Sequence, residues 1–351
     1  MRGRLPRANP LSRAWLALVL AVASGVVACG SDPAPTTTTG PAGVVSTSSP
    51  TTTAASNPAE TLRLYTTVTE ATVNAVVEEF KTDHPEVTIE IFRAPTGEVA
   101  ARIAAEMREG GLQADVLWLT DPLSMQQYET DGLLRSWTPA EIDMVPEPFR
   151  STTFFGTRVL NMVIVHQPDL EDPPADWADL TEVDGIVAIP DPAFAGSAFG
   201  ALAYFEQTDG YGLEFYQSLK DHEAIQVQSP TDVVNGVAEG LYMAGMTLDQ
   251  GANAAIADGS PLTLVWPRSG AIAIYSPIAV VGATGVAAAE TFVDFVLGPT
   301  AQIAIGATGW QPIRSDVAWP PSGIVATVDW AAAFDRQEEL LNSYASIFGG
   351  G

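Results

Sequence analysis

Short apolar runs with the period of a strand alternate with runs that have the period of a helix between residues 62 and 119. In the helical runs, apolar side chains recur every three or four residues. This order of strand, helix, strand, helix and strand favours a parallel sheet with helices on both faces. The expected strands are 62–65, 87–91 and 116–119, and the expected helices contain 73–80 and 99–107.

A second alternating set follows an irregular segment at 137–155 that contains three prolines. Its expected strands are 159–165, 186–189, 242–248, 262–266 and 272–281. Its expected helices begin at Ser197 and Gln250 or occupy 211–220, 230–239 and 289–296. Two such sets predict an α/β fold with two lobes, each a mostly parallel sheet flanked by helices, and a ligand cleft between the lobes.

The two lobes are expected to be joined by extended strands near 156–165 and 266–280. We therefore expect each lobe to be built from two separate stretches of the chain. The first lobe comprises 60–157 with about 271–315, and the second comprises 158–270 with about 316–351.

The acidic composition limits the partners of this chain. Lys and Arg number 16 against 42 Asp and Glu, which gives a formal net charge of −26. A nucleic-acid surface needs clustered Lys and Arg, so binding to nucleic acid is excluded. Docking onto anionic lipid by charge is disfavoured for the same reason. The single cysteine among 351 residues rules out an intramolecular disulfide framework and a cysteine-based zinc cluster.

The first 28 residues have the layout of a signal peptide. Four arginines within residues 1–13 precede an uncharged apolar run at 14–28, which is shorter than the roughly 20 residues of a spanning helix. The run ends at Ala28-Cys29, in a sequence that resembles the bacterial lipobox. This resemblance implies a lipid on the Cys29 thiol and cleavage before it. Residues 29–59, rich in Thr, Ser and Pro, then form a disordered tether, so we expect a protein anchored outside the cell membrane.

Common catalytic motifs are absent from the sequence. We find no G-x-S-x-G, G-x-x-x-x-G-K-[ST], H-E-x-x-H or G-x-G-x-x-G, and the three histidines lie far apart. Asp115, Asp121 and Asp191 would form an acid pair only if folding happened to bring two of them together. We therefore predict no enzymatic activity, no catalytic residue, no cofactor and no metal site. A secreted hydrolase and a structural cell-wall lipoprotein are the alternatives from other classes.

Four segments together resemble extracellular solute-binding proteins of bacterial ABC importers, in the ferric-iron and phosphonate-type group. They are Leu62–Pro122, Ile189–Phe205 (IPDPAFAGSAFGALAYF), Leu264–Val281 (LVWPRSGAIAIYSPIAVV) and Ala287–Val317. The resemblance implies the type 2 periplasmic-binding-protein-like fold, in which two lobes close on a small solute by a hinge motion. It also implies delivery to the permease of an importer, and a monomer as the working unit.

Five loops follow predicted strands and precede predicted helices, which is where open α/β sheets bind ligands. The free N–H groups of a helix start favour an anion there. The expected ligand-binding residues in these loops are Thr66, Thr67, Thr69, Thr96, Gly97, Asp121, Ser197 and Asp249. A buried anion commonly pairs with an arginine, for which Arg93, Arg158 and Arg268 are candidates.

The identity of the solute stays open between several classes. Iron-binding members of the family hold Fe(III) with two adjacent tyrosines, and this chain has no adjacent pair. The pair's position falls at Asp249-Gln250, and the position of an iron-binding histidine falls at Thr67–Thr69. We therefore expect an organic anion or zwitterion, such as a phosphonate or a phosphorylated metabolite. Asp249 would pair with the ammonium of a zwitterion.

Two alternatives for the solute remain. The first is ferric iron, as in the iron-binding members of the family. The second is a polyamine or thiamine-like cation, which the acidic field of the chain would attract. Such a cation could stack on tryptophan, for which the candidates are Trp118, Trp177, Trp266 and Trp310.

Overall fold

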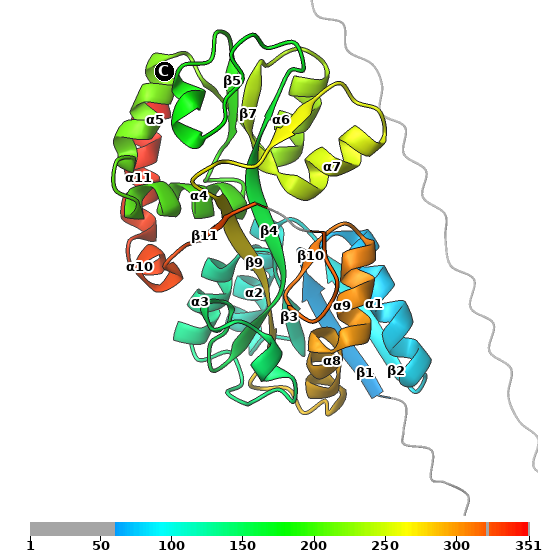
Figure 1. Cartoon of the computed structure of the whole chain (residues 1–351). Helices are drawn as coiled ribbons and strands as arrows, with labels where there is room; N and C mark the ends of the chain where they lie inside the picture. The colour runs from blue at the N-terminus through cyan, green and yellow to red at the C-terminus, as the bar shows by residue number, and fades with distance from the viewer. Residues whose placement is uncertain (1–59, 321–322, 350–351) are drawn as a thin grey trace, which may run out of the picture. The chain divides into compact units, whose positions relative to one another are not determined.

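The computed structural model describes residues 60–320 and 323–349. The predicted signal peptide 1–28, Cys29 and the tether 29–59 lie outside the described residues. The described chain forms two lobes that are joined by two long strands (Figure 1). None of its helices combines the length and the apolar character needed to cross a membrane.

The first lobe contains the predicted strand–helix–strand–helix–strand unit. Strand β1 pairs in parallel with β2 on one side and with β3 on the other. Its strands are β1 (Glu60–Thr66), β2 (Val87–Arg93) and β3 (Val116–Trp118). Its helices are α1 (Glu70–Asp83), α2 (Thr96–Glu109), α3 (Pro122–Thr130), α8 (Ala288–Leu297) and α9 (Pro299–Ala307). Helices α8 and α9 come from late in the chain and pack against α1.

The second lobe repeats this architecture with other strands. Strand β5 pairs in parallel with both β6 and β7. The strands are β5 (Val187–Pro190), β6 (Ile225–Val227), β7 (Ala244–Leu248) and β8 (Thr263–Val265). The helices are α4 (Gly196–Gln207), α5 (Gly212–Asp221), α6 (Pro230–Ala238) and α7 (Asp249–Ala257).

Short 3-10 helices lie on either side of strand β4 in the chain. Ile142–Met144 and Glu147–Phe149 precede this strand, and Trp177–Thr181 follows it.

Two long antiparallel strands connect the lobes. They are β4 (Phe154–His166) and β9 (Ala271–Val280), and every residue of both is buried. The strand order β2-β1-β3-β9-β4-β7-β5-β6 places this pair at the centre of one continuous sheet. The sheet is therefore parallel in its outer parts and antiparallel where the lobes meet. Because both strands run on through both lobes, the residue boundaries of the lobes stay a prediction.

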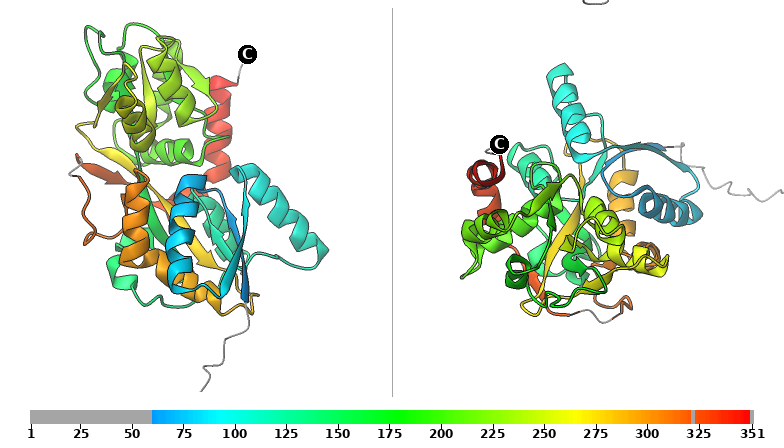
Figure 2. Two further views of the ribbon diagram at one scale, coloured as in Figure 1. Left: turned by 90° about the vertical axis from the view of Figure 1, so that its right-hand side faces the viewer. Right: turned by 90° about the horizontal axis from the view of Figure 1, so that it is seen from above.

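The C-terminal segment also links the lobes. It contains β10 (Gln311–Pro312), β11 (Val325–Thr327), α10 (Trp330–Asp335) and α11 (Gln337–Phe348). Helix α10 packs against α3 of the first lobe, whereas α11 (red) packs against α4 and α5 of the second (Figure 2). Strands β10 and β11 pair with β4 and β9 respectively.

Strand β7 passes so close to its neighbours that only glycine fits at position 245. A Cβ atom there would collide with the carbonyl oxygen of Ala188 on β5 and lie 2.5 Å from Val233 on α6. We expect Gly245→Ala to lower the free energy of unfolding by about 1–3 kcal/mol, since overpacking forces the backbone to shift. Gly285→Ala, where a Cβ meets nothing within 4 Å, is the matched control and should change it by less than about 0.5 kcal/mol. Equal urea midpoints for the two variants would contradict this account of the packing.

Candidate ligand-binding cleft

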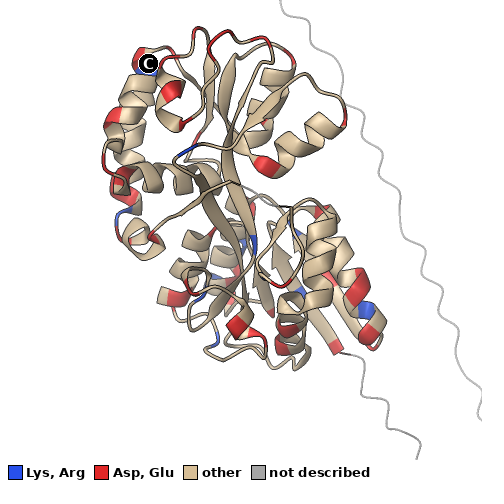
Figure 3. Cartoon of the chain, in the orientation of Figure 1, with Lys and Arg blue, Asp and Glu red and all other residues tan. Residues whose placement is uncertain are grey.

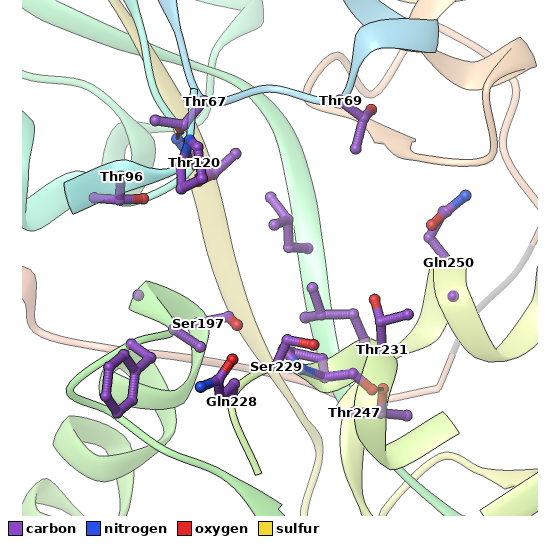
Figure 4. A pocket seen from close by; sticks show the side chains of 18 of the residues that line it. Thr67, Thr69, Thr96, Thr120, Ser197, Gln228, Ser229, Thr231, Thr247 and Gln250 are labelled. Atoms are coloured by element: carbon purple, nitrogen blue, oxygen red, sulfur yellow. Dashed lines mark hydrogen bonds between the residues drawn. The ribbon is translucent and has the colours of Figure 1, made fainter. Parts of the chain in front are cut away.

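A cleft of about 420 Å³ lies between the lobes and is lined by residues of both. Its polar lining consists mainly of hydroxyl and amide side chains that point toward one another across the space (Figure 4). The first lobe supplies Thr67, Thr69, Thr96 and Thr120, and the second supplies Ser197, Gln228, Ser229, Thr231, Thr247 and Gln250.

Five helices begin at this cleft. The N-cap residues of α1, α2, α4, α6 and α7 are Thr69, Pro95, Ala195, Ser229 and Leu248, and all five line it. The cause is the topology, because the carboxyl ends of the parallel strands in both lobes face the same space. Only the N-cap of α6 uses its side chain to accept a first-turn N–H, and at α7 the Gln250 N–H donates to Oδ1 of Asp249 at 2.9 Å. The N-caps of α1, α2 and α4 provide no side-chain acceptor, so the N–H groups and positive dipole ends of these helices favour a negatively charged ligand.

The charged residues of the cleft are two arginines. Arg93 is exposed and donates from Nε to the carbonyl oxygen of Val68 at 2.7 Å. Arg158 has no exposed surface, and its guanidinium carbon lies 4.3 Å from the centre of the Trp310 ring. No Asp, Glu, His or Tyr is among the residues that line the cleft in the described part of the chain. Asp and Glu residues occur on helices and loops of both lobes (Figure 3).

A chain of threonine hydroxyls connects the cleft to Arg158. The Thr69 hydroxyl lies 2.9 Å from that of Thr72, which lies 2.9 Å from that of Thr308. Nη1 of Arg158 donates to the same Thr72 hydroxyl over a long 3.4 Å. The Thr69 hydroxyl in the cleft is therefore linked to Thr72, which also contacts Thr308 and Arg158.

The model of bacterial extracellular solute-binding proteins matches residues 62–311 of this sequence. The chain belongs to that family. It is therefore a solute-binding protein of an ABC importer, with a small-molecule ligand and the importer's permease as its partners. The resemblance found in the four sequence segments is confirmed.

Solved structures of the same fold include binding proteins with different ligands. Iron-bound HitA of Pseudomonas aeruginosa is 20% identical, with a TM-score of 0.71 over 82% of this chain and 99% of that one. AfuA of Actinobacillus pleuropneumoniae, solved with fructose-6-phosphate bound, is also 20% identical, with a TM-score of 0.71 over 83% of this chain and 99% of that one.

A relative was also found by sequence. An uncharacterized protein of Haemophilus influenzae is 26% identical over 251 residues, which are 66% of this chain and 70% of that protein.

Four of the eight predicted binding residues of this solute-binding protein line the cleft, namely Thr67, Thr69, Thr96 and Ser197. Thr67 and Glu70 have the spacing of a capping box, but α1 begins at Glu70, with Thr69 as its N-cap. The Thr67 hydroxyl instead accepts the backbone N–H of Thr120 at 2.8 Å. Which of these residues touch the solute stays a prediction.

The other four predicted residues are not in the cleft lining. The Thr66 hydroxyl donates to the carbonyl oxygen of Trp118 at 2.6 Å, and Gly97 lies within the first turn of α2. Asp121 is the N-cap of α3 and accepts the N–H of Ser124 at 2.8 Å. Asp249 is buried and accepts from Nδ2 of Asn161 at 3.0 Å. Burial raises the pKa of both Asp121 and Asp249 above the ordinary value of 3.8, because it disfavours the charged form of a carboxyl group.

Several lining residues of this solute-binding protein were not predicted from the sequence. They are Gln228, Ser229, Thr231 and Thr247, whereas Thr120 and Gln250 lie in loops that were predicted to bind the ligand. Residues 228–231 span the turn after β6 and the first turn of α6, and β6 is a three-residue strand too short to show a period. The Ser229-Pro230 pair at the start of α6 was the one available signal, since Ser at the N-cap and Pro at the first helical position are typical of a helix start.

The structure also shows which of the candidate tryptophans and arginines line the cleft. Trp310 lines the cleft, whereas Trp118 and Trp177 are fully buried in the core and Trp266 donates to the carbonyl oxygen of Ile324. Arg268 is exposed and does not line the cleft. Among the described residues, no group of three His, Cys, Asp or Glu side chains is placed to hold a metal ion.

The raised pKa of Asp121 predicts a pH-dependent cost in stability. Between the ordinary value of 3.8 and the raised value, the folded protein holds a proton that the unfolded chain has released. The free energy of unfolding therefore falls as the pH rises through this range. Asp121→Asn keeps an acceptor for the Ser124 N–H and removes the buried charge, so the variant should melt above the wild type at pH 7.

This gain should shrink as the pH is lowered toward 4, because the wild-type carboxyl then becomes neutral. The control is Asp329→Asn, at an exposed N-cap that accepts the N–H of Ala332, and it should show no such pH-dependent gain. Thermal unfolding between pH 4 and 8 measures both. A constant difference between Asp121→Asn and the wild type over this range would refute the assignment.

Proposed function

We propose that this protein binds a small organic anion, such as a phosphonate or a phosphorylated metabolite, for import. The observation that supports this most directly is the lining of the cleft. The sequence has 42 acidic residues, yet within the described part of the chain the cleft is lined by two arginines and no carboxylate, and five helices begin there. Hydroxyl and amide side chains complete a set of donors that suits phosphoryl oxygens.

The cleft also contains an apolar surface that suits the carbon skeleton of an organic solute. Phe194 lines the cleft with 68% of its surface exposed, and Leu160 and Trp310 add further apolar area. The volume of about 420 Å³ lies within the range of small-molecule pockets, roughly 300–1,000 Å³. An organic ligand uses such a surface, whereas a bare inorganic ion does not.

The side chains that line the cleft give less support to the two alternative solutes, ferric iron and an organic cation. Fe(III) favours phenolate and carboxylate oxygens, and the described lining contains neither Tyr nor an acid. A polyamine or thiamine-like cation would need carboxylates or several aromatic faces, and it would meet two arginines instead. A zwitterion is disfavoured as well, because Asp249 is engaged with Asn161 behind the cleft. The fold alone does not separate these classes, since HitA and AfuA have the same TM-score.

The solute would act by bridging the lobes. Our proposed division assigns 60–157 with 271–315 to the first lobe and 158–270 with 316–351 to the second, with β4 and β9 as the hinge. Binding would shift the population toward a closed form that the permease recognises. We propose that the protein does so as a monomer and without chemical change to the solute, as neither a hydrolase nor a structural lipoprotein. We also propose that it is held outside the cell membrane by a lipid on Cys29.

A thermal-shift comparison of charge classes tests the proposed function. The mature chain is heated with fructose 6-phosphate, methylphosphonate, ferric citrate, spermidine or thiamine. A ligand at 100 times its dissociation constant should add about 2.7 kcal/mol to the free energy of unfolding. We expect such a gain with a phosphorylated or phosphonate compound, and none with spermidine or thiamine. A gain confined to ferric citrate would contradict the proposal.

A further inference from the structure

The described chain contains two buried arginines, Arg158 and Arg314, which differ in whether carboxylates lie next to them. Arg314 has carboxylate partners on two sides, with Nη1 at 3.0 Å from Glu141 and Nη2 at 2.8 Å from Asp316. A third acceptor is the carbonyl oxygen of Leu297, 3.0 Å from Nη1. Its charge is therefore compensated by two carboxylates, both of which are partly exposed.

Arg158 lacks such partners within the described part of the chain. None of the ion pairs found there, with N and O within 4.0 Å, involves its guanidinium, which makes one long hydrogen bond of 3.4 Å to the Thr72 hydroxyl. Its Nε is buried and has no acceptor. Burial lowers the pKa of Arg158 to about 9, which still leaves the side chain charged at neutral pH. A buried charge without a counter-ion lowers the stability of the folded protein.

The position of Arg158 explains why a loss of stability from its buried charge would be retained. The residue lies on β4, which runs between the two lobes, and it is among the residues that line the cleft although its relative exposure is 0%. The Trp310 ring covers the guanidinium, and the Thr72 hydroxyl links it to Thr69 at the start of α1. A negative charge placed in the cleft would thus meet a desolvated cation, which attracts it far more strongly than an exposed one would.

We propose that Arg158 selects the charge of the solute, and that the phosphoryl or phosphonyl group of the solute is the counter-ion that the fold itself does not provide. This inference rests on the proposed function, because it assigns one residue to the anion specificity of the same cleft. Arg93 has a lesser role, since it is exposed and its Nε is already bonded to the Val68 carbonyl. The carbon skeleton of the solute then lies over the remaining lining, which includes Phe194.

The first part of the test uses the protein without any solute. Urea unfolding is compared for the wild type, Arg158→Met and Arg314→Met. Methionine keeps much of the aliphatic volume, so Arg158→Met should unfold at an equal or higher urea concentration than the wild type. Arg314→Met should unfold at a lower one, because it leaves Glu141 and Asp316 without their partner. A loss in Arg158→Met as large as that in Arg314→Met would show that Arg158 is a structural cation and overturn the inference.

The second part measures the response to anions. Fructose 6-phosphate, methylphosphonate and inorganic phosphate are titrated into the wild type, Arg158→Met, Arg158→Lys and the exposed control Arg268→Met, and the melting temperature is followed. For the anions that stabilise the wild type, we expect the affinity of Arg158→Met to fall by at least about tenfold. Arg158→Lys should keep part of the response, and Arg268→Met should keep all of it.

The outcomes separate the two proposals. A wild type that responds to none of these anions would contradict the proposed function, and the role of Arg158 with it. A wild type that responds as strongly as Arg158→Met would contradict the role of Arg158 alone. Binding that is lost in Arg158→Met, while this variant remains as stable as the wild type without solute, would support the inference.

Discussion

The antiparallel pairing of β4 with β9 is the interaction on which the rest of this structure depends. The pairing runs from Phe154 opposite Ala279 to Met162 opposite Ile272, and it is broken only by a shift in register between Gly156 and Val159. The parallel strands of the first lobe join the sheet at β9, and those of the second lobe join it at β4. The carboxyl ends of both sets consequently face each other across one space. The convergence of five helix starts on the cleft follows from this arrangement.

The charge of the chain as a whole differs from the charge of the cleft. A chain this acidic would repel an anion at long range, so the attraction has to be local. In the proposed mode of binding, the cleft provides it through backbone N–H groups, hydroxyls and Arg158, whereas Asp121 and Asp249 do not line the cleft, and burial raises the pKa of both. Among the described residues, the lining of the cleft contains two arginines and no acid, in contrast to the acidic composition of the chain.

Much of the fold could be predicted from the sequence because its long elements carry clear periods. Val73, Val76 and Phe80 place α1, and the apolar run at 159–165 marks the core of β4. The short strand β6 and helix α3 were missed because neither shows a strong pattern of its own. For the cleft, the helix starts were predictable, but the direction of a side chain was not. Thr67 and Thr66 are adjacent on the chain, yet one lines the cleft and the other is buried against Trp118.

Native mass spectrometry tests the central claim most directly. The protein would be purified, without added solute, from the cells that produce it, and its intact mass compared before and after denaturation. The released compound would be identified by negative-ion and metal detection. Our account predicts one small organic anion with a phosphoryl or phosphonyl group for each chain. One iron ion or one organic cation for each chain would contradict it.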